Sequence, residues 1–387
     1  NPTPRQLDLL QRCSELVVNA RNHPGEVRDA LGNLLARKGD AQNAAALAAA
    51  NSQLNNLKAR FSALRSGSRG FDLAGLNVMT GSGALPLSLL PSAIALAVGE
   101  EPPAEVGDAF SRWGFFATGT IGRGERDPDT LDPGFKYDSY DLTAGVDYRM
   151  NDSWILGGAL GFNRNTTDMP GDTGGMDASG WTASGYASWF NGASWYADAV
   201  LSYGHNSYDL DRQIRYSVDG LAGGRTLIDQ VASASPGGDR QALSLSLGRD
   251  FSKNAWTFGP YLRAAYSKLD FDAYTETMSR PDGPGAGFAL SVDGRTLKSL
   301  QGVVGGKFSY AVSTSWGVLV PNAQLEWVKE FEDDPDLLVT RFAFDPNQTP
   351  ILIESDRIDT DYVNLGLGLS GVFASGRSAY VYYEHVA

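Results

Sequence analysis

The stretch Tyr140-Asp-Leu-Thr-Ala-Gly-Val-Asp-Tyr-Arg149 alternates strictly between two kinds of side chain. Tyr140, Leu142 and the residues at positions 144, 146 and 148 are apolar or aromatic, whereas the residues between them are acidic, small or hydroxylated. A period of two is the signature of a β-strand with two different faces. The apolar face is bounded by tyrosine at both ends, which is typical of a strand whose ends lie at a membrane interface.

The same alternation recurs from Trp113 to the end of the chain and predicts eleven strands. A soluble sandwich rarely borders each strand with aromatic side chains, whereas an outer-membrane barrel turns its apolar face to lipid and keeps polar side chains in its lumen. The predicted membrane girdle consists of Trp113, Trp154, Trp181, Trp189, Trp195, Trp256 and Trp327. The predicted polar and charged lumen residues are Asp141, Asp147, Asp198, Asp250, Arg263, Lys307, Glu326 and Glu384.

The connections between these strands alternate in length. Short turns such as Met150-Asn-Asp-Ser153 and Ser252-Lys-Asn254 are followed by long polar segments such as 209–239 and 333–355. Outer-membrane barrels have short periplasmic turns and long external loops, and even strand numbers. We therefore expect an all-β, antiparallel, twelve-stranded transmembrane barrel whose closing strand is missing from this chain. The alternative is a miscount among 270–297 and 337–353, where extended segments could form loop hairpins.

The first 66 residues have helical rather than strand periodicity. Leu7, Leu10, Cys13 and Leu16 recur at helical spacing, and residues 41–64 contain no proline or glycine. The sequence therefore predicts a helical segment at 1–66, an irregular connecting segment at 67–110 and the barrel at 111–387. Cys13 is expected to be a buried helix residue, or to pair with a cysteine outside this chain.

Composition excludes several functional classes. The chain has 387 residues and a net charge of −13, so it lacks the basic surface of a nucleic-acid-binding protein. One cysteine and three histidines leave no disulfide framework, no metal site and no recognisable Ser-His-Asp set, and we expect no cofactor. We place the acidic excess in the long loops. Acidic clusters at 127–132 and 332–336 are read as solvated charge rather than Ca²⁺ sites.

A helix that leads into a twelve-stranded barrel resembles the translocator domain of classical autotransporters, the type V secretion pathway. The pieces that carry the resemblance are the helix Asn51 to Arg65, the first strand Trp113 to Gly122, the hairpin Asn151 to Gly161 and the near-terminal stretch Gly376 to Glu384. The resemblance implies a monomeric outer-membrane anchor with loops at the cell surface, surrounded by lipid and lipopolysaccharide. It also implies help from the barrel-assembly machinery and periplasmic chaperones, and a passenger that crosses to the surface while the linker helix stays in the pore.

The pair Asn55-Asn56 is the one candidate for chemistry. In serine-protease autotransporters a similar pair in the linker helix is cut by asparagine cyclisation, with carboxylates of the lumen assisting. The simpler interpretation, which we favour, is a polar helix face in a wet pore. The helix cations Arg60 and Arg65 are expected to meet acidic side chains of the lumen and hold the helix in place.

Two other functions remain open from the sequence. The chain could be a stand-alone porin or transporter with a periplasmic helical domain, which predicts ion flux. It could also be an outer-membrane protease or lipase, but no convergent Ser, His and Asp set at strand ends can be assembled.

Overall fold

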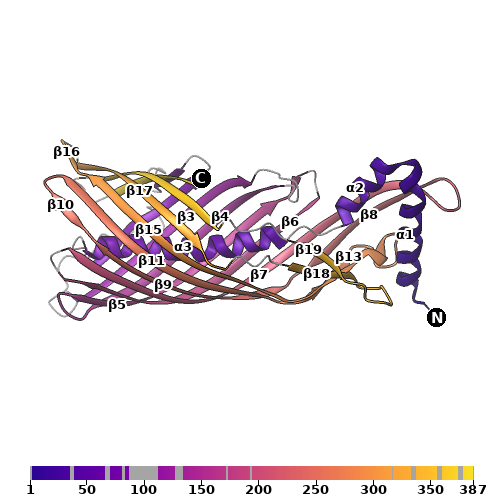
Figure 1. The fold of residues 1–387 in the computed structure, drawn as a ribbon, viewed down its shortest axis with the longest axis horizontal. Helices are drawn as coiled ribbons and strands as arrows, with labels where there is room; N and C mark the ends of the chain where they lie inside the picture. The colour runs from indigo at the N-terminus through magenta and orange to yellow at the C-terminus, as the bar shows by residue number, and fades with distance from the viewer. Residues whose placement is uncertain are drawn as a thin grey trace, which may run out of the picture.

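The computed structural model describes residues 2–34, 39–65, 70–80, 83–86, 112–126, 134–170, 173–191, 194–315, 317–332, 337–354, 360–373 and 378–386. Three helices precede a large sheet that curves around the third helix (Figure 1). The first two helices lie at the opposite end of the sheet from its shortest turns (Figure 1). No helix among the described residues is long and apolar enough to cross a membrane.

The helices are α1 (Pro4–Asn22), α2 (Pro24–Leu34) and α3 (Gly39–Arg65). A capping box starts α1: Gln6 N donates to Thr3 Oγ1 at 3.3 Å, and Thr3 N donates to Gln6 Oε1 at 2.7 Å. Proline at the first helical position needs no hydrogen-bond partner, and Pro24 also separates α1 from α2. Helix α3 is rich in alanine, asparagine and glutamine. The helix propensity of alanine and packing against the surrounding sheet together stabilise a helix of this length.

Long antiparallel strands form the main ladder, each paired with the next one named. They are β3 (Trp113–Arg126), β4 (Phe135–Arg149), β5 (Trp154–Asp168), β6 (Gly174–Phe190), β7 (Trp195–Asp219), β9 (Gly237–Arg249), β11 (Trp256–Phe271), β15 (Arg295–Tyr310), β17 (Gly317–Glu330), β20 (Asp361–Phe373) and β21 (Ser378–Val386). The short strands β10 (Phe251–Lys253) and β16 (Val312–Thr314) extend two of the tight turns. In the part of the chain that the structure describes, this ladder contains the eleven strands that the alternation predicts.

The outward face of the ladder is a belt of apolar side chains. On β11 it runs from Trp256 to Tyr266, and both ends are exposed or half-buried on that face. Ten residue steps span about 34 Å of strand, or roughly 26 Å along the membrane normal at the ~40° tilt of such barrels. This matches the height of the apolar band of outer-membrane barrels, so the belt has the dimensions of a bilayer core.

Several strands continue well beyond the belt. The outward column of β7 is apolar up to Tyr203, then turns polar at His205, yet the strand continues to Asp219 and returns as β8 (Arg225–Ala234). The polar stretch predicted as a loop at 209–239 is therefore a long projecting hairpin. Loop segments beside it form small pairings: β12 (Tyr274–Thr275), β14 (Leu290–Val292), β18 (Leu337–Phe342) and β19 (Ile351–Glu354) make a second sheet, and β13 (Thr277–Met278) pairs with β8.

Helices α1 and α2 cover the projecting hairpin. Leu9, Leu16 and Ala30 form one buried cluster with Ile214 of β7 and Phe288 of the 3₁₀-helix Ala286–Phe288. This cluster lies beyond the apolar belt, on the side of the long loops. The N-terminal helices therefore pack on the long-loop side of the belt and not within it.

The segment 67–110 differs from the expected irregular connection. It contains β1 (Gly70–Thr80), which pairs in parallel with β3, and β2 (Gly83–Pro86), which pairs with β1 and lies close to β21. The edges of a sheet in a membrane need hydrogen-bond partners, because lipid offers none. The parallel pairing of β1 gives the backbone of β3 such a partner on its other side from β4.

Candidate functional site

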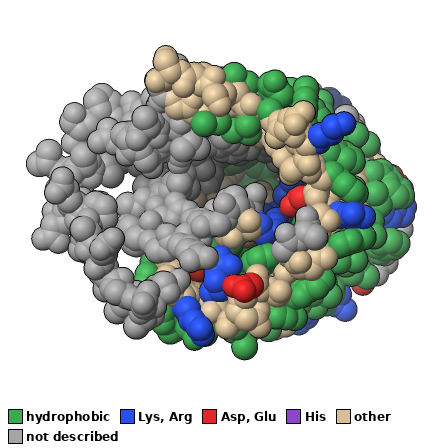
Figure 2. Space-filling model, turned by 90° about the vertical axis from the view of Figure 1, so that its left-hand side faces the viewer, with side chains coloured by type: hydrophobic (Ala, Val, Ile, Leu, Met, Phe, Trp, Pro, Cys, Tyr) green, Lys and Arg blue, Asp and Glu red, His purple; other side chains and the backbone are tan. Residues whose placement is uncertain are grey.

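The interior of the sheet is polar and occupied. Viewed from the end that carries the tight turns, Figure 2 shows a central hollow with acidic and basic side chains around it and hydrophobic side chains on the outer surface. Helix α3 passes along this interior (Figure 1). Its first turns lie near the projecting hairpin, and Arg65 at its last turn contacts Asp198 near the start of β7. The helix therefore runs from the loop end to the tight-turn end.

The first turns of α3 pack through small side chains. Ala41, Ala45 and Ala46 are at most 4% exposed and lie against aromatic and aliphatic side chains of the wall, among them Tyr208 and Phe271. Two arginines of the wall donate hydrogen bonds to this part of α3, one to its backbone and one to a polar side chain. Arg240 donates to the Ala46 carbonyl at 3.3 Å, and Arg295 donates to Asn43 Oδ1 at 2.8 Å.

The middle of α3 makes a chain of neutral hydrogen bonds with the wall. Thr143 Oγ1 donates to Gln53 Oε1 at 2.8 Å and accepts from Asn56 Nδ2 at 2.9 Å. Gln53 Nε2 in turn donates to Ser184 Oγ at 3.1 Å. Glycine in the wall makes room for this approach, because a Cβ at Gly161 would lie 2.3 Å from Gln53 Oε1. The helix is thus keyed to β4, β5 and β6 at one depth.

One turn further on, the contact becomes apolar. Leu57 and Phe61 are at most 2% exposed and pack against Phe116, Tyr186 and Val200. The rings of Phe61 and Tyr186 meet edge to face at a centroid distance of 5.4 Å. This geometry is favourable for aromatic pairs.

The last turns of α3 carry two ion pairs. Arg60 Nε lies 2.9 Å from Asp147 Oδ2, and both side chains are at most 5% exposed. Arg65 Nη1 donates to both carboxylate oxygens of Asp198, at 2.8 and 3.2 Å, and its guanidinium lies 3.9 Å from the centre of the Tyr196 ring. Both arginines of the helix therefore meet lumen carboxylates in charge-assisted hydrogen bonds.

A second charged cluster joins two strands of the wall. Arg263 of β11 forms a two-pronged ion pair with Glu326 of β17, at 2.8 and 3.1 Å. Tyr261 also donates to Glu326, and Gln324 donates to it at 2.9 Å. These contacts reach across β15 and stiffen the interior on the side away from the Arg60 contacts.

The structure places the remaining predicted residues as follows. Asp250 lies 3.9 Å from Arg65 Nε, and Lys307 Nζ lies 5.3 Å from the centre of the Tyr261 ring. Asp141 is half-buried on the face of β4 that carries Thr143, and Glu384 pairs with Gly366 in the ladder. Six tryptophans of the predicted girdle are exposed on the lipid-facing surface: Trp113, Trp154, Trp181, Trp195, Trp256 and Trp327. The seventh, Trp189, is half-buried beside Trp154.

The asparagine pair has different surroundings for its two members. Asn56 is 7% exposed and donates to Thr143, whereas Asn55 is exposed in the pore and its Oδ1 accepts from Lys58 Nζ at 3.1 Å. Neither of these two contacts involves a carboxylate.

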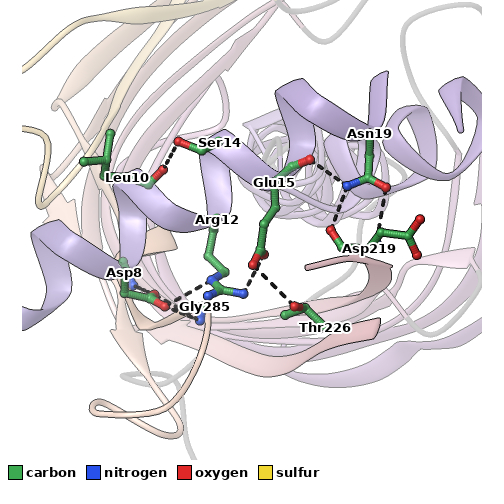
Figure 3. A network of polar contacts seen from close by, with 10 residues as sticks. Asp8, Leu10, Arg12, Ser14, Glu15, Asn19, Asp219, Thr226 and Gly285 are labelled. Atoms are coloured by element: carbon green, nitrogen blue, oxygen red, sulfur yellow. Dashed lines mark hydrogen bonds and ion pairs between the residues drawn. The ribbon is translucent and has the colours of Figure 1, made fainter. Parts of the chain in front are cut away.

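Outside the belt, the buried face of α1 is unexpectedly polar (Figure 3). Asp8 accepts from the backbone amides of Gly285 and Gly287 at 3.0 and 2.9 Å. Glu15 is 1% exposed, accepts from Arg12 at 2.5 Å and from Thr226 Oγ1 at 3.3 Å. At the end of the helix, Asn19 donates to the Asp219 carbonyl at 2.8 Å and accepts from the Asp219 amide at 3.2 Å (Figure 3). Helix α1 is thus fastened to loop backbone by directional bonds.

A buried arginine fastens the end of α2 in the same way. Arg212 of β7 forms an ion pair with Glu276, both side chains being at most 6% exposed. Its remaining donors reach the Leu34 carbonyl and the Phe288 carbonyl, each at 3.1 Å. One side chain therefore joins α2, the projecting hairpin and the loop after β11.

Sequence reasoning missed the α1 network, Arg212 with Glu276, and Gln53 with Ser184. Isolated polar residues on a helix that also carries a stronger apolar stripe give no signal of which face is buried. Of metal sites, the described part of the chain contains no group of three His, Cys, Asp or Glu side chains that could hold an ion. The acidic cluster at 127–132 lies outside the described residues, as does the cluster at 332–336 apart from Glu332.

Comparison with known proteins gives a consistent result. The family model for the autotransporter beta-domain matches residues 115–384. An uncharacterized protein in the trpE-trpG intergenic region of Pseudomonas putida is 30% identical over 198 residues, which cover 50% of this chain and 30% of that protein. Esterase EstA of Pseudomonas aeruginosa is 28% identical over 200 residues, covering 50% of this chain and 28% of the relative.

Among solved structures, the beta domain of the Bordetella autotransporter BrkA is similar, with a TM-score of 0.45 and 21% identity over 71% of this chain and 92% of that one. The chain spans less than a third of the length of the curated relatives it matches.

Proposed function

Because the chain belongs to the autotransporter beta-domain family, whose members are outer-membrane translocators of type V secretion, we propose that α3 is the linker left in the pore after an N-terminal passenger has reached the cell surface. In this proposal α1 and α2 are the surface-exposed continuation of that linker. They dock on the external loops and hold the plug from outside. The passenger, the barrel-assembly machinery and periplasmic chaperones are the partners that this role requires.

The direction of α3 is the observation that supports the proposal. Its N-terminal end adjoins the long hairpin, and its C-terminal end adjoins the tight turns. Long loops of such barrels face outward and short turns face the periplasm. A chain that enters the pore from the periplasmic side at residue 65 and leaves it at residue 39 delivers everything before residue 39 to the outside.

Cysteine labelling on whole cells tests this topology. Val17 on α1 is 73% exposed, and Asn151 is exposed in a tight turn. In a Cys13→Ser background, which removes the one cysteine of these 387 residues, Val17→Cys and Asn151→Cys each supply a single thiol within them. A membrane-impermeant maleimide is expected to label Val17→Cys in intact cells and Asn151→Cys after permeabilisation of the outer membrane alone. Labelling in the opposite order would overturn the proposal.

The porin alternative makes a different prediction for the same cells. A periplasmic helical domain would leave Val17→Cys protected until the outer membrane is opened. It also requires a conducting pore, whereas α3 lies in the lumen and contacts its wall from Ala41 to Arg65.

Self-cleavage between Asn55 and Asn56 is a second candidate, favoured by the exposure of Asn55 to the pore. A single-turnover cyclisation would need a base near the reacting amide. Intact-mass measurement of the chain recovered from outer membranes tests it. An intact Asn55–Asn56 bond in the recovered chain removes the candidate, and Asn55→Ala is the control for any shortened product.

A further inference from the structure

The apolar belt ends abruptly on the side of the long loops. On most strands of the main ladder, the next outward-facing residue beyond the last apolar one is charged. The successive pairs are Ile121 and Arg123, Tyr140 and Asp138, Phe162 and Arg164, Tyr266 and Lys268, Leu300 and Lys298, Trp327 and Lys329, and Val363 and Asp361. On the proposed topology this edge lies at the level of the outer-leaflet headgroups. Most of its cations are neutralised by a neighbour, as in the pairs Arg123 with Asp138 and Lys329 with Asp361.

One place on this edge carries excess positive charge. Lys268 and Lys298 lie directly opposite each other on β11 and β15. Like charges at directly opposed positions repel, since their Cβ atoms are only about 5 Å apart. Asp270 accepts from Lys268 at 2.6 Å and from Thr296 Oγ1 at 2.6 Å, so this carboxylate is already engaged. Lys298 is exposed and has no carboxylate within 4 Å among the described residues. The pair thus retains a net charge of about +1, and an anion bridging the two amines would relieve the repulsion.

A groove in the lipid-facing surface lies on the same two strands, further toward the tight-turn end than this pair. Its volume is about 790 Å³, within the usual range of ligand sites. The floor is made shallow by Ala264 and Gly302, which lie opposite each other one step below Tyr266 and Leu300. Leu262, Val304 and Trp327 line its lower part, and Phe331 closes its upper end over Gly302. The lining is mostly apolar, with the ion pair Lys329–Asp361 also on it. On β11 and β15, Tyr266 and Leu300 lie between the groove and the two lysines.

We propose that this groove and the Lys268–Lys298 pair form a binding site for a phosphorylated outer-leaflet glycolipid, the lipopolysaccharide of the membrane in which the barrel lies. One acyl chain would occupy the groove between Ala264, Gly302 and Trp327, and a phosphate would bridge the two lysine amines. The assignment rests on the proposed topology, because it requires the long-loop side to face outward. Gly302 and Lys298 are four residues apart on β15, which is about 13 Å along the strand. The acyl chain and the headgroup of one lipid molecule can therefore reach both parts of the site.

Charge complementarity selects this occupant over an ordinary phospholipid. A single-phosphate lipid in the inner leaflet would meet the tight-turn end of the belt, not the lysine pair. A neutral lipid would fill the groove but leave Lys298 without a counter-charge. A glycolipid with a phosphate at the outer surface satisfies both parts of the site.

Native mass spectrometry of the complete chain, released from detergent in the presence of purified lipid A, tests the proposal. The informative variant is Lys268→Gln with Lys298→Gln. The matched control is Arg123→Gln with Arg164→Gln, which removes two cations from the same edge away from the groove. We expect about a tenfold loss of retained lipid A in the lysine variant, the size of effect of losing a charge-assisted hydrogen bond, and little change in the control. Gly302→Leu, which fills the groove without altering charge, is expected to weaken retention as well.

Two results would overturn the site. One is equal loss in the lysine variant and the control. The other is retention of phosphatidylglycerol or of dephosphorylated lipid A as strong as that of lipid A itself. Each variant is also tested in the cell-surface labelling assay with Val17→Cys. Normal labelling together with unchanged lipid A retention sinks the lipid site alone, whereas protection of Val17→Cys in all variants sinks the proposed topology.

Discussion

Arg60 of α3 donates its Nε–H to Asp147 of β4 at 2.9 Å, and each side chain is at most 5% exposed. Burial makes this pair asymmetric in its consequences. Removing one partner leaves a desolvated charge, whereas replacing both by apolar side chains of similar size costs little. The pair therefore fixes where the helix stops in the pore more than it adds to total stability.

A double-mutant cycle at this contact has a definite expected pattern. Arg60→Met and Asp147→Leu are each expected to destabilise the folded barrel by roughly 3–5 kcal/mol, because each leaves an uncompensated buried charge. The double variant is expected to recover most of that loss. Samples are heated to a series of temperatures and then run on a cold gel, and the measurement is the temperature at which the band of the folded barrel disappears. Additive losses in the double variant would show that the two side chains act independently.

Removing the plug is expected to open the pore. In planar-bilayer recordings, a chain lacking residues 1–66 should conduct more than the whole chain, because α3 occupies part of the lumen from Ala41 to Arg65. The matched control lacks residues 1–34 only, which removes α1 and α2 but leaves α3. Equal conductance of all three chains would argue against a plugging role for α3.

The membrane-spanning part was readable from sequence, and the external part was not. Strict alternation, as in Tyr140 to Arg149, identifies strands and the face turned to lipid, since lipid contact demands an apolar side chain at every second position. The same rule fails beyond Tyr203, where both faces of β7 are wet or covered by protein. The polar stretch 209–239 therefore predicts a loop, although the structure has a hairpin there.

Helix α1 shows a second limit. Of the apolar residues at helical spacing, Leu7 and Leu10 are 51% and 66% exposed, whereas Leu16 is 6% exposed and Cys13 packs against the buried cluster. Beside Leu9 and Leu16, that face carries the polar residues Asp8, Glu15 and Asn19, whose partners include backbone groups and a hydroxyl some 200 or more positions away in the sequence. Single-helix periodicity contains no information about such partners. Pairings across the lumen, such as Gln53 with Ser184, are hidden for the same reason.

Glycine in the lumen wall is expected to matter where a helix side chain approaches it. Gly161→Val should displace Gln53, because a Cβ there would lie 2.3 Å from Gln53 Oε1. Losing the buried bonds of Gln53 to Thr143 and Ser184 should cost about 1–3 kcal/mol. Gly185→Val on the neighbouring strand is the control, since nothing lies within 4 Å of its Cβ position. Equal effects of the two variants on the unfolding temperature would contradict this role of Gly161.

The docking of α1 can be released at a single backbone contact. A Cβ at Gly287 would lie 2.6 Å from the Leu9 amide nitrogen and 2.7 Å from the Arg5 carbonyl oxygen, and neither backbone atom can move without shifting the helix. Gly287→Ala is therefore expected to lift α1 from the loops. Gly32→Ala in α2, with open space at its Cβ, is the control.

The thiol of Cys13 reports that release. Burial raises the pKa of Cys13, and the Asp345 and Asp8 carboxylates raise it further. In the docked chain the thiolate is therefore scarce at neutral pH, and maleimide labelling should keep accelerating as pH rises past the ordinary thiol pKa of about 8.5. Because the folded pKa is raised, docking is expected to weaken above that pH. In Gly287→Ala labelling should be several-fold faster at pH 7.5 and should level off near the ordinary pKa. The same slow, steadily rising profile in Gly287→Ala and Gly32→Ala would mean that α1 does not depend on this contact.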